Sequence, residues 1–245
     1  LHRRTLPMMI EGIDPGRVEA AVFDLGGVFL AGGVESVHAF GDRHGLDADA
    51  WRAIRRELFH DDDGLWAAVE RGRATFAEFV ARLRELAAEH GSQVSVEDAR
   101  NFMGNTGLAA TERLRTEIVD AAARLHTRMP TALLTNNIPE WRGGWRSLLD
   151  VDGLFDVVVD SCEVGMRKPE PAIYELTRAK LGLPHTSLFF VDDLGVNLKA
   201  ARTLGWQTLR YDDTARVLSV LDALVAAKPE SSRSGRASPS STLLR

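Results

Sequence analysis

Cysteine is nearly absent from this 245-residue chain, because Cys162 is the only one. A lone cysteine excludes an internal disulfide and is typical of a reducing compartment, so we expect a cytoplasmic location. Cys162 follows a strand-like run, and we interpret it as a packing residue. A strong excess of one sign of charge is also absent, since 30 Lys and Arg against 35 Asp and Glu leave a formal net charge of −5. That balance provides no basic surface for nucleic acid, so we expect no nucleic-acid partner.

Long hydrophobic runs are missing as well. No stretch is long enough to span a bilayer, and residues 1–16 carry basic residues with no apolar run behind them. We therefore expect neither a membrane partner nor a secretory signal. Residues 228–245 hold six serines, four cations and one acid, a composition that predicts a disordered tail. Gly26-Gly27 lacks the spacing of a P-loop or a dinucleotide fingerprint, so we expect neither nucleotide site.

The chain does contain enough apolar residues for a sizeable core, since 44% of its residues are hydrophobic. Five short runs are rich in Val, Leu and Phe and alternate little, which is typical of strands buried on both faces of a parallel sheet. These runs are residues 20–24, 131–135, 156–160, 188–192 and 207–211. Helical patterns separate most of them, at residues 111–125, 171–181 and 196–204. The alternation predicts a doubly wound α/β fold with right-handed crossovers.

The first crossover is unusually long. More than a hundred residues separate Asp24 from Thr131, and no strand signal stands out between residues 34 and 105. Thr75 and Glu78 have the spacing of a capping box, and apolar residues at helical spacing follow them. A structureless loop of this length would be improbable in a compact domain. The segment is therefore predicted to be helical.

This segment divides the chain into parts. We predict an α/β core from residues 18–33 and 107–227, with a helical cap inserted at 34–106 and the tail at 228–245. The cap is rooted beside the Asp24 turn, so we expect it to cover the site, exclude water and select substrates.

Asp24 ends the first apolar run and is followed by a glycine turn, Gly26-Gly27. This order places a carboxylate at the carboxyl end of a strand, the edge where open α/β sheets bind ligands. A strand-end Asp that only caps a turn is an equally good explanation of this residue alone. Taken with the later segments, Asp24 is the best candidate for a nucleophile that attacks phosphorus.

Three later residues could bind the transferred phosphoryl group. Thr135 ends a strand-like run and offers a hydroxyl, and Asn136 adds an amide or backbone donor. Lys168, in a turn before Pro169, offers a point charge suited to phosphate. Taken singly, the Thr and Asn are also explained by turn chemistry and the Lys by a solvated side chain.

Asp192 and Asp193 are adjacent acids at the end of another apolar run. Their repulsion requires a stabilising positive charge, and Mg²⁺ with oxygen ligands is the natural choice. A helix N-terminus that favours acids is the alternative. Asn197, four residues further on, could brace the loop.

Together these residues resemble a known family. Four motifs of the haloacid dehalogenase superfamily are matched, in order, by Asp24, Thr135, Lys168 and Asp192-Asp193. Within residues 161–206, the segments SCEVGMRKPEPAIYELTRAKLG and LFFVDDLGVNLKAARTLGW are similar to the N-terminal phosphatase domain of soluble epoxide hydrolase. They also resemble the domains that precede some acyl-CoA dehydrogenases. The resemblance covers roughly residues 18–214, and the motif set is highly specific when complete and in order.

The resemblance implies a Rossmann-like core with an inserted helical cap, Mg²⁺ as cofactor and a small phosphate monoester as substrate. It implies that Asp24 is the catalytic nucleophile and a metal ligand. It also implies that Thr135 and Lys168 bind the phosphate.

For the metal, the resemblance implies direct ligation by Asp193 with help from Asp192, and a further contact from the backbone carbonyl of Gly26. Gly26 is also the one departure from the pattern, since the family usually has a second Asp there as general acid and base. Loss of such a group typically costs about 10²–10⁴ in rate. Some relatives also carry glycine at this position, and the resemblance implies that at least some of those hydrolyse phosphates.

Some residues near the motifs have weaker assignments. Asn137, Trp141 and Trp145 follow the second motif closely enough to line the pocket. The two tryptophans could equally pack as helix neighbours, which is the interpretation we favour. Residues 60–63 (HDDD) look like a metal cluster, but their spacing fits no standard site and we expect a solvated acidic loop.

Three functions remain open on the sequence. The leading hypothesis is a Mg²⁺-dependent phosphatase acting on a small phosphorylated metabolite through an aspartyl phosphate at Asp24. A haloacid dehalogenase would use the same kind of nucleophile without a metal, and Asp192-Asp193 argues against it. A binding or regulatory protein on a degenerate fold is supported only by Gly26. The sequence carries no signal for an oligomeric state.

Overall fold

The computed structural model describes residues 9–60, 64–104 and 113–229. Most of the expected tail lies outside the described residues, as do Asp61, Asp62 and Asp63 of the acidic run. Among the described residues, no helix is both long and apolar enough to cross a membrane.

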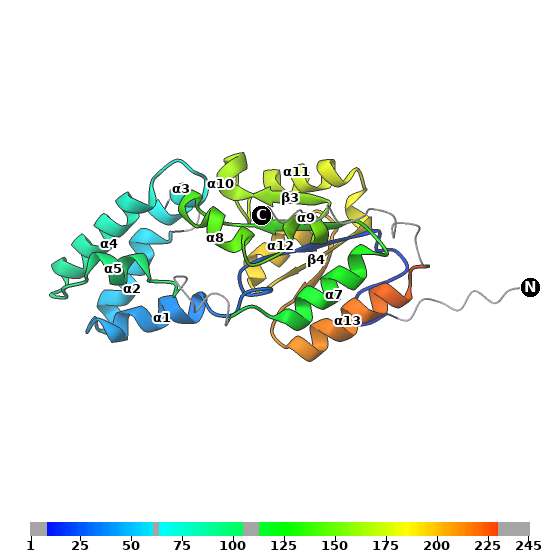
Figure 1. Ribbon diagram of the computed structural model, residues 1–245. Helices are drawn as coiled ribbons and strands as arrows, with labels where there is room; N and C mark the ends of the chain where they lie inside the picture. The colour runs from blue at the N-terminus through cyan, green and yellow to red at the C-terminus, as the bar shows by residue number, and fades with distance from the viewer. Residues whose placement is uncertain (1–8, 61–63, 105–112, 230–245) are drawn as a thin grey trace, which may run out of the picture.

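Five parallel strands form one sheet in the order β3-β2-β1-β4-β5 (Figure 1). They are β1 (Ala20–Phe23), β2 (Thr131–Thr135), β3 (Val157–Asp160), β4 (Leu188–Asp192) and β5 (Gln207–Arg210). Each strand begins and ends within one residue of its predicted bounds. The chain adds β2 and β3 on one side of β1, then returns to add β4 and β5 on the other. The carboxyl ends of β1 and β4 therefore border the topological switch point, where sheets of this kind bind ligands.

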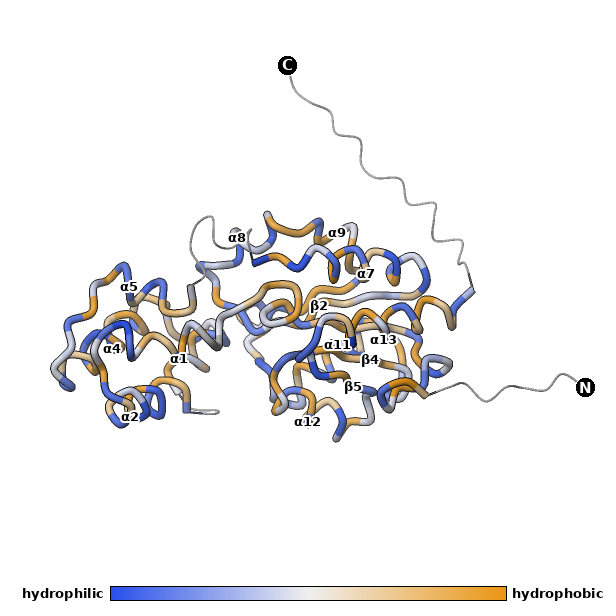
Figure 2. Tube along the Cα trace, turned by 90° about the horizontal axis from the view of Figure 1, so that it is seen from below, coloured by the Kyte–Doolittle hydropathy of each residue, from blue (hydrophilic) through white to orange (hydrophobic). Residues whose placement is uncertain are grey.

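Helices cover both faces of this sheet. One face carries α7 (Thr116–His126) and α13 (Thr214–Ala226), and the other carries α11 (Pro171–Leu181) and α12 (Gly195–Thr203). Phe23 shares a core with α7 and α13, whereas its neighbour Val22 shares one with α11 and α12. Because successive side chains of a strand point to opposite faces, this two-sided cover explains the near-continuous apolar runs. Figure 2 shows β2 and β4 mostly in hydrophobic colours. The doubly wound α/β prediction is confirmed.

A separate helical lobe lies between β1 and α7 in the chain and stands apart from the sheet in both views (Figures 1 and 2). Its helices are α1 (Val34–Arg43), α2 (Ala48–Leu58), α3 (Leu65–Glu70), α4 (Phe76–Glu89) and α5 (Val96–Arg100). Their apolar faces form a second core around Phe79 and Phe102. The predicted capping box is present, since Glu78 N–H donates to Thr75 Oγ1 at 3.2 Å and Thr75 N–H to Glu78 Oε2 at 2.7 Å.

Short helices complete the connections: 3₁₀ helix η1 (Pro139–Trp141), α8 (Arg142–Arg146), α9 (Val151–Leu154), α10 (Ser161–Val164) and 3₁₀ helix η2 (His185–Ser187). The helix expected over residues 111–125 was placed too early, because α7 begins at Thr116. Leu114 pairs with Leu30 in an antiparallel bridge, and Arg115 N–H donates to Phe29 O at 2.8 Å. These long-range pairings engage the backbone that would otherwise form the first turn.

Candidate active site

Asp24 follows β1 directly and is only 6% exposed. Its N–H donates to Val191 O at 3.0 Å, so the sheet register places it beside the end of β4. Its Oδ1 accepts the Leu25 N–H at 2.7 Å and lies 2.6 Å from Lys168 Nζ. Within the part of the chain that the structure describes, both of these contacts are made by Oδ1 and none is recorded for Oδ2.

Three carboxylates converge at this edge of the sheet. Oxygen atoms of Asp24, Asp192 and Asp193 lie within 4.8 Å of one another. Lys168 Nζ pairs with Asp24 and, at 2.7 Å, with Asp192 Oδ2, so its positive charge lies against two of these three acids. An excess of negative charge on oxygen donors alone fits a hard divalent cation such as Mg²⁺.

Burial dominates the electrostatics of Asp24. It raises the pKa of Asp24 well above its ordinary value; Lys168 opposes this shift, and the carboxylates of Asp192 and Asp193 add to it. Burial disfavours the charged form of Lys168, but the two carboxylates that it contacts outweigh this and raise its pKa. Lys168 therefore remains a fixed positive charge beside Asp24.

The two adjacent acids have different surroundings. Asp192 is fully buried, and its oxygens accept the Leu194 N–H at 2.8 Å and Asn197 Nδ2 at 3.0 and 3.1 Å. Asp193 lines the cavity described below, and its side chain lies against Gly27. A Cβ added at Gly27 would lie 2.2 Å from Asp193 Cγ. Asp192 thus anchors the loop, with Asn197 as its brace, while Asp193 faces the cavity.

The end of β2 supplies Thr135 and Asn136. Thr135 is buried and lines the cavity. The side chain of Asn136 clamps the backbone of Lys168, donating to its carbonyl at 2.9 Å and accepting its N–H at 2.8 Å. Its side-chain amide is thus engaged in holding Lys168, so a phosphate contact from Asn136 would use the backbone N–H. Sequence reasoning missed this clamp because the two residues are 32 positions apart.

A cavity of about 940 Å³ extends from the carboxylates to the helical lobe. Its polar lining includes Asp24, Gly26, Thr135, Lys168 and Asp193, and its apolar lining includes Val37, Phe59, Trp66, Met103 and Trp141. Asn137 and Trp145 also line it. Trp141 packs against Trp66 with ring centroids 5.7 Å apart, whereas Trp145 belongs to the core beneath α7. Both tryptophans therefore line the cavity and also pack.

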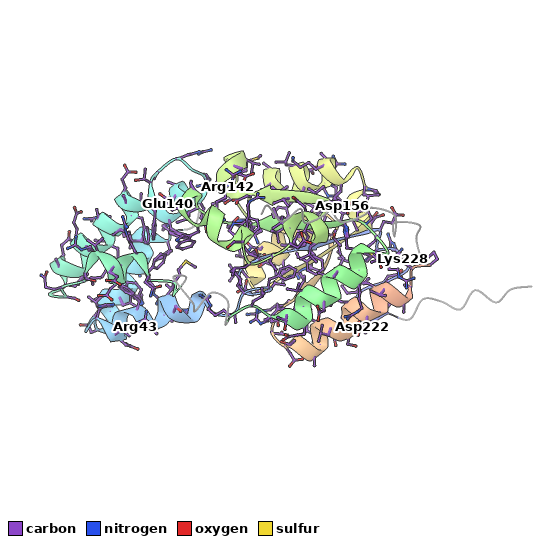
Figure 3. The ribbon with its side chains drawn as sticks, in the orientation of Figure 1. Arg43, Glu140, Arg142, Asp156, Asp222 and Lys228 are labelled. Atoms are coloured by element: carbon purple, nitrogen blue, oxygen red, sulfur yellow. The ribbon has the colours of Figure 1, made fainter. Side chains whose placement is uncertain are left out.

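Two acids of the cavity wall, Glu70 and Glu140, were not predicted. Glu70, at the end of α3, accepts a hydrogen bond from Trp66 Nε1 at 2.8 Å, and Arg167 Nε lies 2.6 Å from its other oxygen. Burial raises the pKa of Glu70, and Arg167 opposes that shift. An isolated acid in a six-residue helix carries no periodic signal, and its partner is 97 positions away. Glu140, labelled in Figure 3 where the two lobes meet, also lines the cavity.

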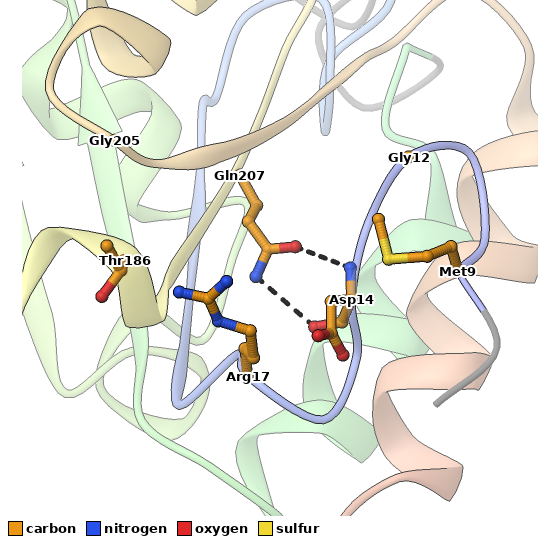
Figure 4. A pocket seen from close by; sticks show the side chains of 7 residues that line it. All are labelled: Met9, Gly12, Asp14, Arg17, Thr186, Gly205 and Gln207. Carbon is orange, nitrogen blue, oxygen red and sulfur yellow. Dashed lines mark hydrogen bonds between the residues drawn. The ribbon is translucent and has the colours of Figure 1, made fainter. Parts of the chain in front are cut away.

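A smaller cavity of about 360 Å³ lies at the opposite, amino-terminal ends of the strands (Figure 4). Asp14 N–H donates to Gln207 Oε1 at 2.7 Å, and Gln207 Nε2 donates to Asp14 O at 3.4 Å. Asp14 is the single acid among its described lining residues. This cavity therefore offers no carboxylate cluster like the one at Asp24.

Cys162 lies in α10, next to Asp160 at the end of β3. It is half-buried, and its Sγ lies 3.2 Å from Asp160 Oδ1. Burial and the Asp160 carboxylate raise the pKa of the thiol to about 12. The thiol is thus protonated at neutral pH and is a poor nucleophile.

The chain is similar to curated proteins over most of its own length. It is 32% identical over 209 residues to acyl-CoA dehydrogenase family member 10 of Mus musculus. It is 28% identical over 224 residues to bifunctional epoxide hydrolase 2 of Sus scrofa. These alignments cover 84% and 86% of this chain, but only 19% and 39% of the two relatives. The chain thus spans less than two fifths of either relative.

Solved structures share the fold. A haloacid dehalogenase-family enzyme of Bacteroides thetaiotaomicron, in complex with magnesium and inorganic phosphate, matches with a TM-score of 0.57 and 24% identity. That match covers 82% of this chain and 98% of the other. L-2-haloacid dehalogenase of Xanthobacter autotrophicus matches with a TM-score of 0.53 and 20% identity, over 79% and 77% of the two chains.

A family model described as haloacid dehalogenase-like hydrolase matches residues 18–205, which include every residue of the site at the switch point. The protein belongs to the haloacid dehalogenase-like hydrolase family.

Proposed function

We propose that the protein is a Mg²⁺-dependent phosphatase that hydrolyses a small phosphorylated metabolite. The observation that carries this proposal is the convergence of Asp24, Asp192 and Asp193 around one buried lysine. A carboxylate that attacks a haloacid needs no additional acids nearby, and their charge would disfavour an anionic substrate. With a divalent cation, the same acids favour a phosphate ester.

In the first step, an Asp24 oxygen attacks phosphorus while the bond from phosphorus to the ester oxygen breaks. The leaving group departs as an alkoxide or phenoxide that takes a proton from solvent. Lys168 and the Thr135 hydroxyl bind the equatorial oxygens, on which negative charge is spread. Water then attacks phosphorus of the aspartyl phosphate while the bond from phosphorus to the Asp24 oxygen breaks. A proton of the water passes to solvent, phosphate is released and the Asp24 carboxylate is restored.

Asp24, Asp193 and the Gly26 carbonyl would hold Mg²⁺, which when bound supplies positive charge close to the phosphoryl oxygens. Asp192 assists by fixing Lys168 and the loop that carries Asp193. The Bacteroides enzyme of the same fold, which binds magnesium and inorganic phosphate, supports this assignment.

The helical lobe is proposed to be a cap over residues 34–106, on a core of residues 18–33 and 107–227. Phe59, Trp66 and other side chains of the lobe form apolar walls of the cavity. Such walls exclude water from the reacting centre. They also favour a leaving group with apolar surface.

The test is phosphate release from a panel of phosphorylated metabolites, measured with Mg²⁺ and with EDTA. We expect release that depends on Mg²⁺. The same protein is assayed for halide release from 2-haloacids. Halide release that EDTA leaves unchanged would establish the dehalogenase alternative, and inactivity in both assays would favour the binding protein.

A further inference from the structure

Two ion pairs of opposite polarity bind the end of α3 to the turn between α10 and α11. Arg167 Nε on the turn lies 2.6 Å from Glu70 Oε2 on the helix. Arg71 Nε on the helix donates to Glu170 Oε1 on the turn at 2.7 Å. Consecutive residues of the helical lobe thus contact one short segment of the sheet lobe.

Both pairs are largely removed from solvent. The side chains of Glu70 and Arg167 are 9% and 15% exposed, and those of Arg71 and Glu170 are 9% and 25% exposed. The arrangement of the four charges also favours one docked position of α3 on the turn. If the two pairs exchanged partners, Glu70 would face Glu170 and Arg71 would face Arg167. Water competes weakly with charges at this depth, so the pairs resist separation.

The docked helix reaches the phosphate-binding lysine through a continuous set of contacts. Glu70 Oε2 also accepts from Asn136 Nδ2 at 3.4 Å. Asn136 in turn holds the N–H and the carbonyl of Lys168 at 2.8 and 2.9 Å. Arg167 is the residue before Lys168 in the chain. The Glu70 carboxylate therefore contacts both Arg167 and Asn136, which flank and hold the Lys168 backbone. Lys168 Nζ in turn lies 2.6 Å from Asp24 Oδ1.

We propose that Glu70 is a positioning residue that couples docking of the helical lobe to the placement of Lys168. When the lobe is docked, the turn is fixed and the lysine charge is aimed at the reacting edge. When the lobe is released, Arg167 and Asn136 lose their shared acceptor and the turn loosens. The inference rests on the proposed function in one respect, namely that Lys168 binds the phosphoryl group.

Two kinds of variant separate this coupling from a general loss of structure. Glu70→Gln keeps the shape of the side chain and removes the charge that Arg167 pairs with. Arg71→Glu and Glu170→Arg each place like charges at the docking surface, and the double variant restores an ion pair with reversed polarity. Glu57→Gln is the matched control, because it disrupts an exposed ion pair with Arg82 in the same lobe, far from the turn in the chain.

Three measurements are made on the full chain: amide hydrogen exchange of residues 165–170, calorimetric binding of inorganic phosphate with Mg²⁺, and kcat and KM on a hydrolysed phosphate ester. We expect Glu70→Gln and both single charge reversals to accelerate exchange in this turn. Phosphate affinity should fall on the order of tenfold, which is the effect expected from losing one charge-assisted hydrogen bond. kcat should fall by up to about 10²-fold, the effect of a misplaced catalytic group.

The reversed double variant should recover most of both losses, and Glu57→Gln should match the wild type throughout. If Glu70→Gln leaves exchange and phosphate affinity like those of Glu57→Gln, or if the double variant is no better than the single reversals, the coupling is refuted. A wild type that hydrolyses no phosphate ester would refute the proposed function instead, and hydrogen exchange would still decide the coupling.

Discussion

Asp24 and Lys168 form a charged pair that is almost entirely removed from solvent. Burial raises the pKa of Asp24, and contact with the lysine at 2.6 Å opposes that shift. Asp192 is committed to Lys168 and Asn197, whereas Asp193 faces the cavity. Neighbouring residues of similar chemistry thus have separate roles, and single substitutions should separate them.

Asp24→Asn keeps the size of the side chain and removes the nucleophile. We expect turnover to fall by more than about 10³-fold, as when other enzymes lose a nucleophile. The fold should persist, because Asn has nearly the size of Asp and Lys168 retains Asp192 as a buried partner. Circular dichroism, melting temperature and phosphate release check both statements. Hydrolysis at a comparable rate in the purified variant would remove the covalent mechanism.

Asp193→Ala should weaken Mg²⁺ binding while leaving the melting temperature nearly unchanged. Asp192→Ala should chiefly reduce stability, by about 3–5 kcal/mol, because it takes one partner from a buried ion pair. Calorimetric Mg²⁺ titration and thermal unfolding of both variants provide the comparison. Undiminished Mg²⁺ affinity in Asp193→Ala is the result that this assignment does not allow.

Gly26 leaves the departing oxygen without an acid, so the rate should depend steeply on leaving-group pKa. Aryl, acyl and anomeric sugar phosphates should react faster than alkyl phosphates. A Cβ added at Gly26 would have nothing within 4 Å, so the turn has room for the first atom of a side chain there. Gly26→Asp should raise turnover on alkyl phosphates most, by at most about 10²–10⁴.

A rate series over graded phosphate esters checks this expectation. A flat dependence in the wild type, with chemistry shown to be rate-limiting, would mean that another residue supplies the proton.

At the scale of elements, the turn after β1 decides whether the site can assemble. Gly27 has φ 77°, a left-handed conformation that disfavours other residues, and it lies against Asp193. Gly26, one residue earlier, has neither restriction. Substitution of Gly26 therefore serves as the control for substitution of Gly27.

Gly27→Ala should lower stability by roughly 1–2 kcal/mol through its backbone conformation alone, and should displace Asp193 and weaken Mg²⁺ binding. Gly26→Ala should change neither quantity appreciably. Thermal unfolding and Mg²⁺ titration of the two variants make the comparison. Equal effects in both would show that the turn tolerates a side chain at either position.

Local signals in the sequence were sufficient for the strands, for the capping box at Thr75 and for α11, which begins at Pro171 and ends before Gly182 as predicted. Long-range contacts were not accessible in the same way. The start of α7 is set by pairing of Leu114 with Leu30, and the Asn136 clamp joins two distant loops. Such contacts exist only once the sheet has brought these segments together.

At the scale of the whole molecule, a sheet lobe supplies charged groups and a helical lobe supplies apolar walls to one cavity. The proposed metal ligands and phosphate-binding groups all come from the sheet lobe, at the end of β1, the end of β2, the turn before α11 and the end of β4. The helical lobe contributes Phe59 and Trp66 to the walls, and Glu70 to the junction. The reacting groups and the apolar walls thus come from different lobes, and Glu70 links the two at their junction.

The central claim is that a phosphoryl group passes through Asp24. Wild-type protein is mixed with Mg²⁺ and a phosphate monoester that it hydrolyses, quenched in acid within one turnover, digested and analysed by mass spectrometry. We predict a phosphoryl group on the peptide that contains Asp24, and neither this group nor turnover in Asp24→Asn. A phosphoryl group on another residue, or wild-type turnover by Asp24→Asn, would contradict the claim.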